Sequence, residues 1–325
     1  MRRTLADRSA QATPATPALL ATRVGRVELR SAVLTASGTS GHGAELAGYG
    51  ELQALGAVVV KSLAAHPWPG NEGMRLHGAA GGSMLNRVGL QGPGVAAWRT
   101  EKLPALLARH ATVVASIWGR SAEEFAAAAA ALAGAPGVVA LEVNVSCPNL
   151  SGHVFAHSPG STAAAVAAAV GALGGSAAGA GGSAIPVWAK LSPAVADIVE
   201  IADAALGAGA AGLTLVNTMP GMWVDVEGRR APMAGGLSGA ALHPVAVRAV
   251  YDCRRAFRGA AIVGVGGVSS GVDAVELLMA GADAVQVGTA TFADPRAPWR
   301  VQEELARWCA RRATSVEEIV GAAQR

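Results

Sequence analysis

A short segment near the middle of the chain, LEVNVSCPN at residues 141–149, gathers side chains that could do chemistry. Its valines alternate as in a β-strand, and Pro148 lacks an N–H and disfavours helix for the residue before it. The segment therefore predicts a strand that ends at Cys147, close to the amides of Asn144 and Asn149. A thiol at a strand end can contact a ligand, although a free cysteine more often only fills space in a core.

Lysine is scarce, which makes its positions informative. Of 26 basic residues only Lys61, Lys102 and Lys190 are lysines. Arginine and lysine are not interchangeable, so a chain biased towards arginine is expected to keep lysine where a compact ammonium is needed. Lys61 and Lys190 end apolar segments and are candidates for such positions, whereas Lys102 lies in the charged start of a predicted helix.

The amino-acid composition limits the classes of protein to which this chain can belong. The chain has 325 residues, 51% hydrophobic, which allows a sizeable core in one or two domains. No apolar segment resembles a signal peptide or a membrane span, and residues 1–23 read as a flexible extension. The net charge of +3 is spread without a basic block and gives no support to nucleic-acid binding. Three scattered cysteines favour a cytoplasmic protein without disulfides or a metal site.

Eight apolar segments that read as strands alternate with helical segments. They lie near residues 32–36, 56–61, 112–118, 138–145, 185–190, 211–216, 260–265 and 284–287. Eight such units predict a parallel sheet closed into an α/β TIM (β/α)8 barrel, a single domain over residues 24–312 with a tail at 313–325. An open doubly wound sheet is the alternative, but no GxGxxG motif with an acidic partner follows the first strand.

The segments between these strands carry further expectations. We expect a helix over residues 44–55 and a capping box in which Ser121 and Glu124 begin another helix. Residues 62–94 and 219–239 are rich in glycine and read as long loops, which are usually functional in a compact chain.

The C-terminal ends of barrel strands meet at one mouth, where TIM-barrel active sites lie. The polar or glycine ends predicted here are Ser37, Lys61, Ser62, Ser116, Asn144, Cys147, Lys190, Asn217, Thr218, Gly266, Gly267, Gly288 and Thr289. The last four follow strands seven and eight, where this fold commonly binds phosphate through backbone N–H groups. A phosphorylated cofactor or substrate is expected, unless these glycines only make tight turns.

The motifs ASGTSGHG, GAVVVKS, MLNRVGLQGPG, LEVNVSCPN, VWAKLSP, LVNT, GGLSG, VGVGGV and VGTATF resemble those of the dihydroorotate dehydrogenase family. They follow the family's order over residues 24–295. The cysteine in SCPN resembles the soluble class 1 enzymes, and GLTLVNTMPGMWVD and GGLSGAALHP are most similar to the NAD-linked branch, class 1B. That branch pairs an FMN barrel subunit with a second subunit that carries FAD and an iron–sulfur cluster.

The resemblance implies FMN in the barrel mouth and oxidation of (S)-dihydroorotate to orotate in de novo pyrimidine biosynthesis. The implied FMN contacts are Ser37, Lys61, Ser62, Ser116, Asn144, Lys190, Val216, Gly239, Gly266, Gly267, Gly288 and Thr289. Lys190 would lie at the N1/O2 side of the ring, where a cation stabilises the anionic reduced flavin. Ser116 stands where the family usually has asparagine.

The substrate is a planar ring with a carboxylate and an imide edge, which amide side chains match with a donor and an acceptor each. The implied substrate contacts are Lys61, Asn86, Gly89, Leu90, Asn144, Asn149, Asn217 and Thr218. Cys147 would remove the proton at C5 while hydride leaves C6 for the flavin N5.

Other readings stay open. The chain could be an FMN-dependent oxidoreductase of another pyrimidine-like or specialised metabolite, or a non-redox phosphate-binding barrel that serves as a binding subunit. The electron acceptor could be NAD through the partner subunit, or fumarate, because three cysteines cannot hold an iron–sulfur cluster alone. A homodimer or a heterotetramer is expected. His153 and His157, in the loop after Cys147, read as surface residues.

Overall fold

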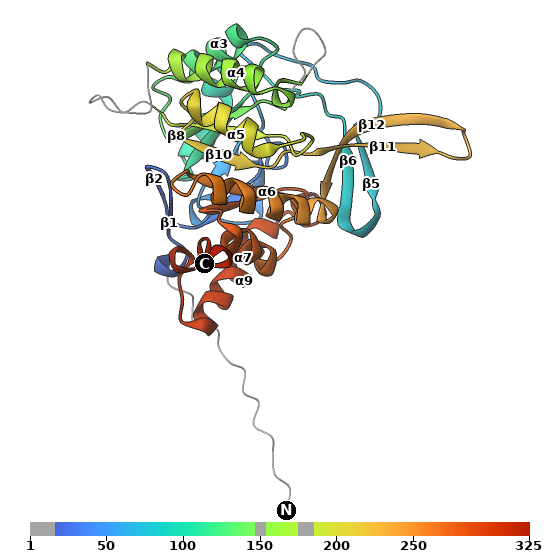
Figure 1. Ribbon diagram of the computed structural model, residues 1–325. Coiled ribbons are helices and arrows are strands. Elements are labelled where there is room, and N and C mark those ends of the chain that lie inside the picture. Colours follow the sequence, from blue (N-terminus) through green and yellow to red (C-terminus); the bar gives the residue numbers. More distant parts are fainter. Residues whose placement is uncertain (1–16, 147–153, 175–184) are drawn as a thin grey trace, which may run out of the picture.

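An eight-stranded parallel sheet forms the centre of the computed structural model, which describes residues 17–146, 154–174 and 185–325 (Figure 1). In spatial order its strands are β3 (Val33–Thr35), β14 (Ala284–Val287), β13 (Ile262–Val265), β10 (Gly212–Leu215), β9 (Val187–Leu191), β8 (Val138–Asn144), β7 (Val113–Ile117) and β4 (Val58–Val59). A parallel bridge between Leu34 and Ala57 joins the first strand to the last. The ring is therefore a TIM barrel, and all eight predicted barrel strands are confirmed.

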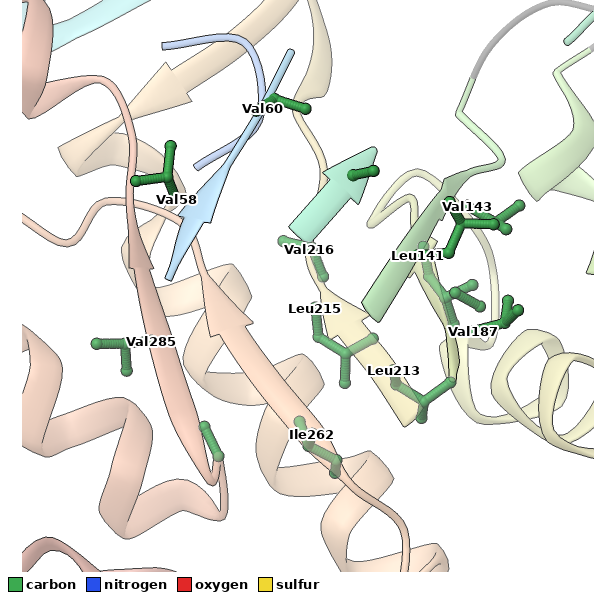
Figure 2. Packing of buried hydrophobic residues seen from close by; sticks show 14 of the residues in the cluster. Val58, Val60, Leu141, Val143, Val187, Leu213, Leu215, Val216, Ile262 and Val285 are labelled. Atoms are coloured by element: carbon green, nitrogen blue, oxygen red, sulfur yellow. The ribbon is translucent and has the colours of Figure 1, made fainter. Parts of the chain in front are cut away.

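Each barrel strand is buried on both faces because helices cover its outer side. Leu141 and Val143 of β8 belong to the cluster packed between barrel and helices, as do Leu213 and Leu215 of β10 (Figure 2). The residues between them face the barrel interior, where Trp188 belongs to a second apolar cluster. The continuous apolar runs of these strands thus reflect a two-sided environment.

Helices return the chain from one barrel strand to the next. They are α3 (Ala122–Leu132), α4 (Pro159–Ala172), α5 (Ile198–Gly207), α6 (His243–Ala256), α7 (Gly271–Ala280) and α9 (Ala297–Arg312), with shorter segments at α1 (Val95–Ala97), η5 (Trp98–Lys102), α2 (Leu103–Leu107) and α8 (Ala290–Ala293). Ser121 caps α3 by accepting from the Glu124 N–H. The expected reciprocal bond differs, since the Glu124 carboxylate accepts from the Arg120 N–H.

The expected helix over residues 44–55 is wrong. The segment contains two short 3-10 turns, η2 (Glu45–Gly48) and η3 (Leu52–Ala54), separated at Gly50. A Cβ atom at Gly50 would lie 2.5 Å from the Trp299 ring, so the backbone passes directly over that side chain. Glycines at 48 and 50 weaken helix propensity, and this close packing fixes the irregular path instead.

Residues 219–239, expected as a long loop, are mostly strand, which corrects the sequence prediction, whereas residues 62–94 are mostly irregular, as expected, and contain one strand pair. β5 (Leu76–Ala79) and β6 (Ser83–Asn86) pair with β11 (Met219–Asp225) and β12 (Arg230–Gly239) in a four-stranded antiparallel sheet. We call this sheet the arm; it extends away from the barrel, with the β11–β12 hairpin reaching furthest (Figure 1). Glycine-rich strands resemble loops in sequence, and their pairing with one another helps to stabilise them.

The remaining ends pack against the barrel. A hairpin of β1 (Thr22–Val24) and β2 (Val27–Leu29) contributes its apolar residues to the interior cluster that contains Trp188. Residues 313–325, expected as a tail, form α10 (Val316–Ile319) and η8 (Ala322–Gln324), which contact α7. Within the described ranges, none of the helices has the length and apolar character needed to cross a membrane.

Candidate active site

A cavity of about 1330 Å³, including space open to solvent, lies at the C-terminal ends of the barrel strands and under the arm. Seven of the eight barrel strands, all except β7, contribute lining residues at or just after their ends. The predicted site residues that line it are Ser37, Lys61, Ser62, Asn86, Gly89, Leu90, Asn144, Lys190, Val216, Asn217, Thr218, Gly239, Gly266, Gly267, Gly288 and Thr289. The structure therefore brings these residues together from segments that lie as far apart in the sequence as Ser37 and Thr289.

Asn144 is the centre of a polar network on one wall of the cavity. Its Nδ2 donates to Ser62 Oγ at 3.2 Å, and its Oδ1 accepts from Asn217 Nδ2 at 3.0 Å and from the Ser146 N–H at 3.1 Å. Ser37 Oγ lies 3.2 Å from Ser62 Oγ, and either can donate. The network fixes the rotamers of amides that face the cavity, so they are oriented before any ligand arrives.

Ser116 does not line the cavity, in contrast to the sequence prediction. It is fully buried on β7, and its hydroxyl lies 2.9 Å from Ser62 Oγ. The short serine side chain ends beneath Ser62 and supports it, whereas a longer amide at this position would extend further towards the ligand. Ser116 is therefore a support for the cavity wall.

The ends of β13 and β14 form a cradle of backbone donors. Gly267, Gly288 and Thr289 line the cavity, and none of their N–H groups donates a hydrogen bond to another described residue. The Thr289 hydroxyl donates to Ser238 Oγ at 2.8 Å. Free N–H groups grouped in this way form a site for an anion such as phosphate.

Glycine is required in this cradle for conformational and steric reasons. Gly267 has a φ of +68°, and a Cβ atom there would lie 2.6 Å from His243 Cβ. Gly239 has a φ of +90°, and a Cβ would lie 2.5 Å from the Gly82 carbonyl oxygen. Only glycine adopts these angles readily without displacing its neighbours.

Lys61 lies in a positively charged corner. Burial, followed by the charge of Arg75, lowers the pKa of the Lys61 ammonium. Burial, and next the charge of Lys61, lower the pKa of His42 to about 4, so this imidazole is neutral at physiological pH. A ligand carboxylate beside Lys61 would offset this positive charge, which makes the corner suited to an acidic substrate.

Lys190 extends from β9 into the opposite, barrel side of the cavity and is 5% exposed. Its Nζ lies 3.6 Å from Glu142 Oε1, and Glu142 is fully buried on β8. The other carboxylate oxygen, Oε2, accepts from Gln286 Nε2 at 2.8 Å. The ammonium at the cavity surface therefore has a buried counter-ion behind it.

The loop after β6 supplies the lining from the arm. Asn86 donates from Nδ2 to the Gly236 carbonyl at 3.2 Å, which joins β6 to β12. Gly89 and Leu90 follow with φ values of +73° and +60°. A left-handed conformation is rare for a branched side chain such as leucine and concentrates at functional sites, consistent with a backbone shaped for close approach to a ligand.

Sequence reasoning missed several residues of this site. Ser238, Arg87 and Phe292 also line the cavity, and Phe292 is 51% exposed. Glu142 was in the quoted LEVNVSCPN motif, two residues before Asn144. On a strand that spacing places both side chains on one face, so the interior position of Glu142 could have been inferred.

Cys147 and Asn149, the predicted base and one predicted substrate contact, lie outside the described residues, as does His153. The described chain reaches Ser146 at the cavity wall. The thiols of Cys253 and Cys309 are buried in helices, and burial raises the pKa of Cys253 to about 12. His157 is exposed, as expected. No cluster of three or more metal-ligating side chains occurs among the residues with described positions.

Comparison with known proteins agrees with this geometry. Residues 19–308 match the family model described as dihydroorotate dehydrogenase. The dihydroorotate dehydrogenase B (NAD(+)) catalytic subunit of Trichlorobacter lovleyi is 41% identical, with 93% of this chain and 98% of that protein covered. The protein of the same name from Solidesulfovibrio magneticus is 43% identical over 87% of this chain and 90% of its own length.

A solved structure supports the fold independently. The crystal structure of DHODH from Eimeria tenella in complex with ferulenol superposes with a TM-score of 0.80, covering 96% of this chain and 90% of that chain at 22% identity. At that identity the likeness concerns the fold alone. The family-model match and the similarity to the bacterial catalytic subunits, which extend along nearly the whole chain, show that this protein belongs to the dihydroorotate dehydrogenase family.

Proposed function

We propose that this protein oxidises (S)-dihydroorotate to orotate, the redox step of de novo pyrimidine biosynthesis, with FMN held in the barrel mouth. The observation that carries the proposal is the cavity itself. It combines a cradle of free backbone N–H groups, an ammonium on each of two sides and a wall of oriented carboxamides. Family membership and the names of the bacterial relatives support the same activity.

FMN fits the residues present. Its phosphate matches the unpaired N–H groups of Gly267, Gly288 and Thr289. A Cβ atom at Gly267 would displace His243, so the backbone of this cradle depends on glycine there. Ser37, Ser62, Asn144 and Val216 would hold the ring, Gly239 and Gly266 would lie along its tail, and Ser116 would act through Ser62. When bound, FMN would be the acceptor of the hydride and its two electrons. Lys190 would lie beside the ring and place positive charge where negative charge develops.

The substrate fits the space between the arm and the network wall. Lys61 would bind its carboxylate, because that anion offsets the charge shared by Lys61 and Arg75. Asn86, Asn144, Asn149, Asn217 and Thr218 would pair with the imide edge, and the backbone of Gly89 and Leu90 would close the site. Carboxamides suit an imide because each offers both a donor and an acceptor.

Cys147 would act as the base that takes the C5 proton. β8 delivers the chain to the cavity wall at Ser146, one residue before the thiol. The Ser146 Oγ is buried without a hydrogen-bond partner in the described part of the chain, so it is free to contact a ligand or relay a proton. Because the thiolate is the active base, the reaction should speed up as pH rises through the thiol pKa.

The bacterial relatives are named as catalytic subunits, and a partner subunit carrying FAD and an iron–sulfur cluster would pass electrons from this barrel to NAD. A homodimer of this chain, or a heterotetramer with that partner, would be the working assembly. Purified barrel alone should then reduce dyes with dihydroorotate but reduce NAD only when the partner is added.

An anaerobic spectral titration tests the proposed function. The purified protein should be yellow, orotate should perturb its flavin spectrum, and dihydroorotate should bleach it within seconds. Bleaching by another dihydropyrimidine but not by dihydroorotate would favour an oxidoreductase with a different substrate. A colourless protein that takes up no FMN on reconstitution would instead favour a barrel without redox chemistry.

A further inference from the structure

A buried carboxylate stands behind Lys190 and is not used by the reaction as described. Glu142 is fully buried and does not line the cavity, yet its Oε1 lies 3.6 Å from Lys190 Nζ. The strand β8 carries Glu142, and β14 carries its hydrogen-bond donor Gln286. Those strands are four positions apart in the eight-stranded ring, so this bond crosses the barrel interior.

The surroundings make a charge here costly. The interior layer below contains Trp188, Val114 and Val263, which are buried and apolar. A carboxylate and an ammonium taken out of water lose hydration, and hydrophobic residues of similar size often replace such pairs without loss of stability. A pair in which only the lysine reaches the cavity is therefore better explained by an effect on the ligand than by stability alone.

We propose that Glu142 is a positioning residue that acts through Lys190 to set the reduction potential of the bound flavin. Glu142 holds the ammonium in place, and its negative charge partly cancels the field that Lys190 exerts on the ring. In a dry interior such charges interact strongly. The inference rests on the proposed function, since it requires FMN beside Lys190.

The Glu142→Gln variant of the FMN-loaded protein tests this directly. Glutamine has the same length and can still accept from Gln286, but it lacks the negative charge. Stripped of its counter-charge, the ammonium should favour the anionic reduced flavin. At the midpoint potential of the wild type, the ratio of reduced to oxidised flavin should rise about tenfold or more, equivalent to about 30 mV for a two-electron couple.

Two further variants separate charge from packing. Glu142→Asp keeps the charge but draws it back from Lys190, so it should shift the ratio in the same direction by a smaller factor. Thr214→Val is the matched control, because Thr214 is equally buried on β10, the strand next to the one that carries Lys190, and its hydroxyl has no partner among described residues. That substitution should leave the potential unchanged.

Redox equilibration with a dye of known potential measures all three variants. An unchanged or more negative potential in Glu142→Gln would overturn the inference and reduce Glu142 to a structural residue. If that variant does not fold, Glu142→Asp decides, and a potential equal to that of the Thr214→Val control overturns the inference. A wild type that binds no FMN would contradict both the proposed function and this inference. A wild type that binds FMN but is not reduced by dihydroorotate would contradict the proposed function alone.

Discussion

Removing the ammonium of Lys190 should destabilise the barrel strongly. In Lys190→Met the apolar stem is largely kept, but Glu142 remains fully buried with its Oε1 facing no counter-ion. Gln286 then donates the one hydrogen bond that the Glu142 carboxylate accepts from the described residues. Breaking a buried ion pair by removing one partner costs about 3–5 kcal/mol.

The double variant Lys190→Met/Glu142→Gln should recover most of that loss. Both charges are then absent, and replacing a whole buried pair by uncharged side chains is often neutral or stabilising. We expect the double variant to be within about 1.5 kcal/mol of the wild type, so that the two substitutions are strongly non-additive, as expected for residues in direct contact.

Urea unfolding at pH 7, followed by circular dichroism, measures the free energy of unfolding of the four proteins in this cycle. Each is measured with and without added FMN, because a ligand that binds only the folded state adds stability of its own. Breaking such a buried pair is costly. A loss of unfolding free energy below about 1 kcal/mol in Lys190→Met would therefore refute the interpretation of Lys190 and Glu142 as a buried pair. A double variant as unstable as Lys190→Met would refute it too.

Three further predictions follow from the geometry. Gly267→Ala should weaken FMN binding about tenfold or more in a fluorescence titration, equivalent to about 1.4 kcal/mol, because its Cβ would lie 2.6 Å from His243 Cβ. Gly48 has open space around it, so the control variant Gly48→Ala should leave FMN binding unchanged. Burial lowers the pKa of His42 from 6.5 to about 4, so between those values the unfolded chain binds a proton that the folded one does not. Stability should therefore fall as pH drops from 6.5 to about 4, and His42→Gln should flatten that part of the unfolding curve. The Cys253 thiol, whose pKa burial raises to about 12, should resist iodoacetamide in the native protein at pH 8, as mass spectrometry would show, and labelling at the rate of the unfolded protein would contradict this.

The barrel could be predicted from the sequence because each strand is a short apolar run that ends in a polar residue or glycine. Such runs arise where both faces of a strand are covered, and the polar ends mark the mouth. The arm could not be predicted in this way. β11 and β12 contain proline and several glycines; β12 pairs with β6 across about 150 residues of sequence, and β11 pairs with β12.

The cavity residues were predictable as a set, but their partners were not. Lys61 and Lys190 stood out because lysine is rare in this chain, and the glycines after β13 and β14 because the fold binds phosphate there. The contacts between these side chains depend on how far each strand extends towards the barrel mouth. Ser116 therefore proved to lie under Ser62, and Glu142 to lie behind Lys190.

The most direct test of the central claim is the anaerobic reduction of the bound flavin by dihydroorotate, followed by stopped-flow absorbance in the wild type and in Cys147→Ala. We expect rapid bleaching in the wild type. In the variant we expect bleaching at least about 100-fold slower, the range typical of a lost general base, with FMN content and orotate affinity nearly intact. Equal rates in the two proteins, or no bleaching of the wild type, would contradict the mechanism proposed for this cavity.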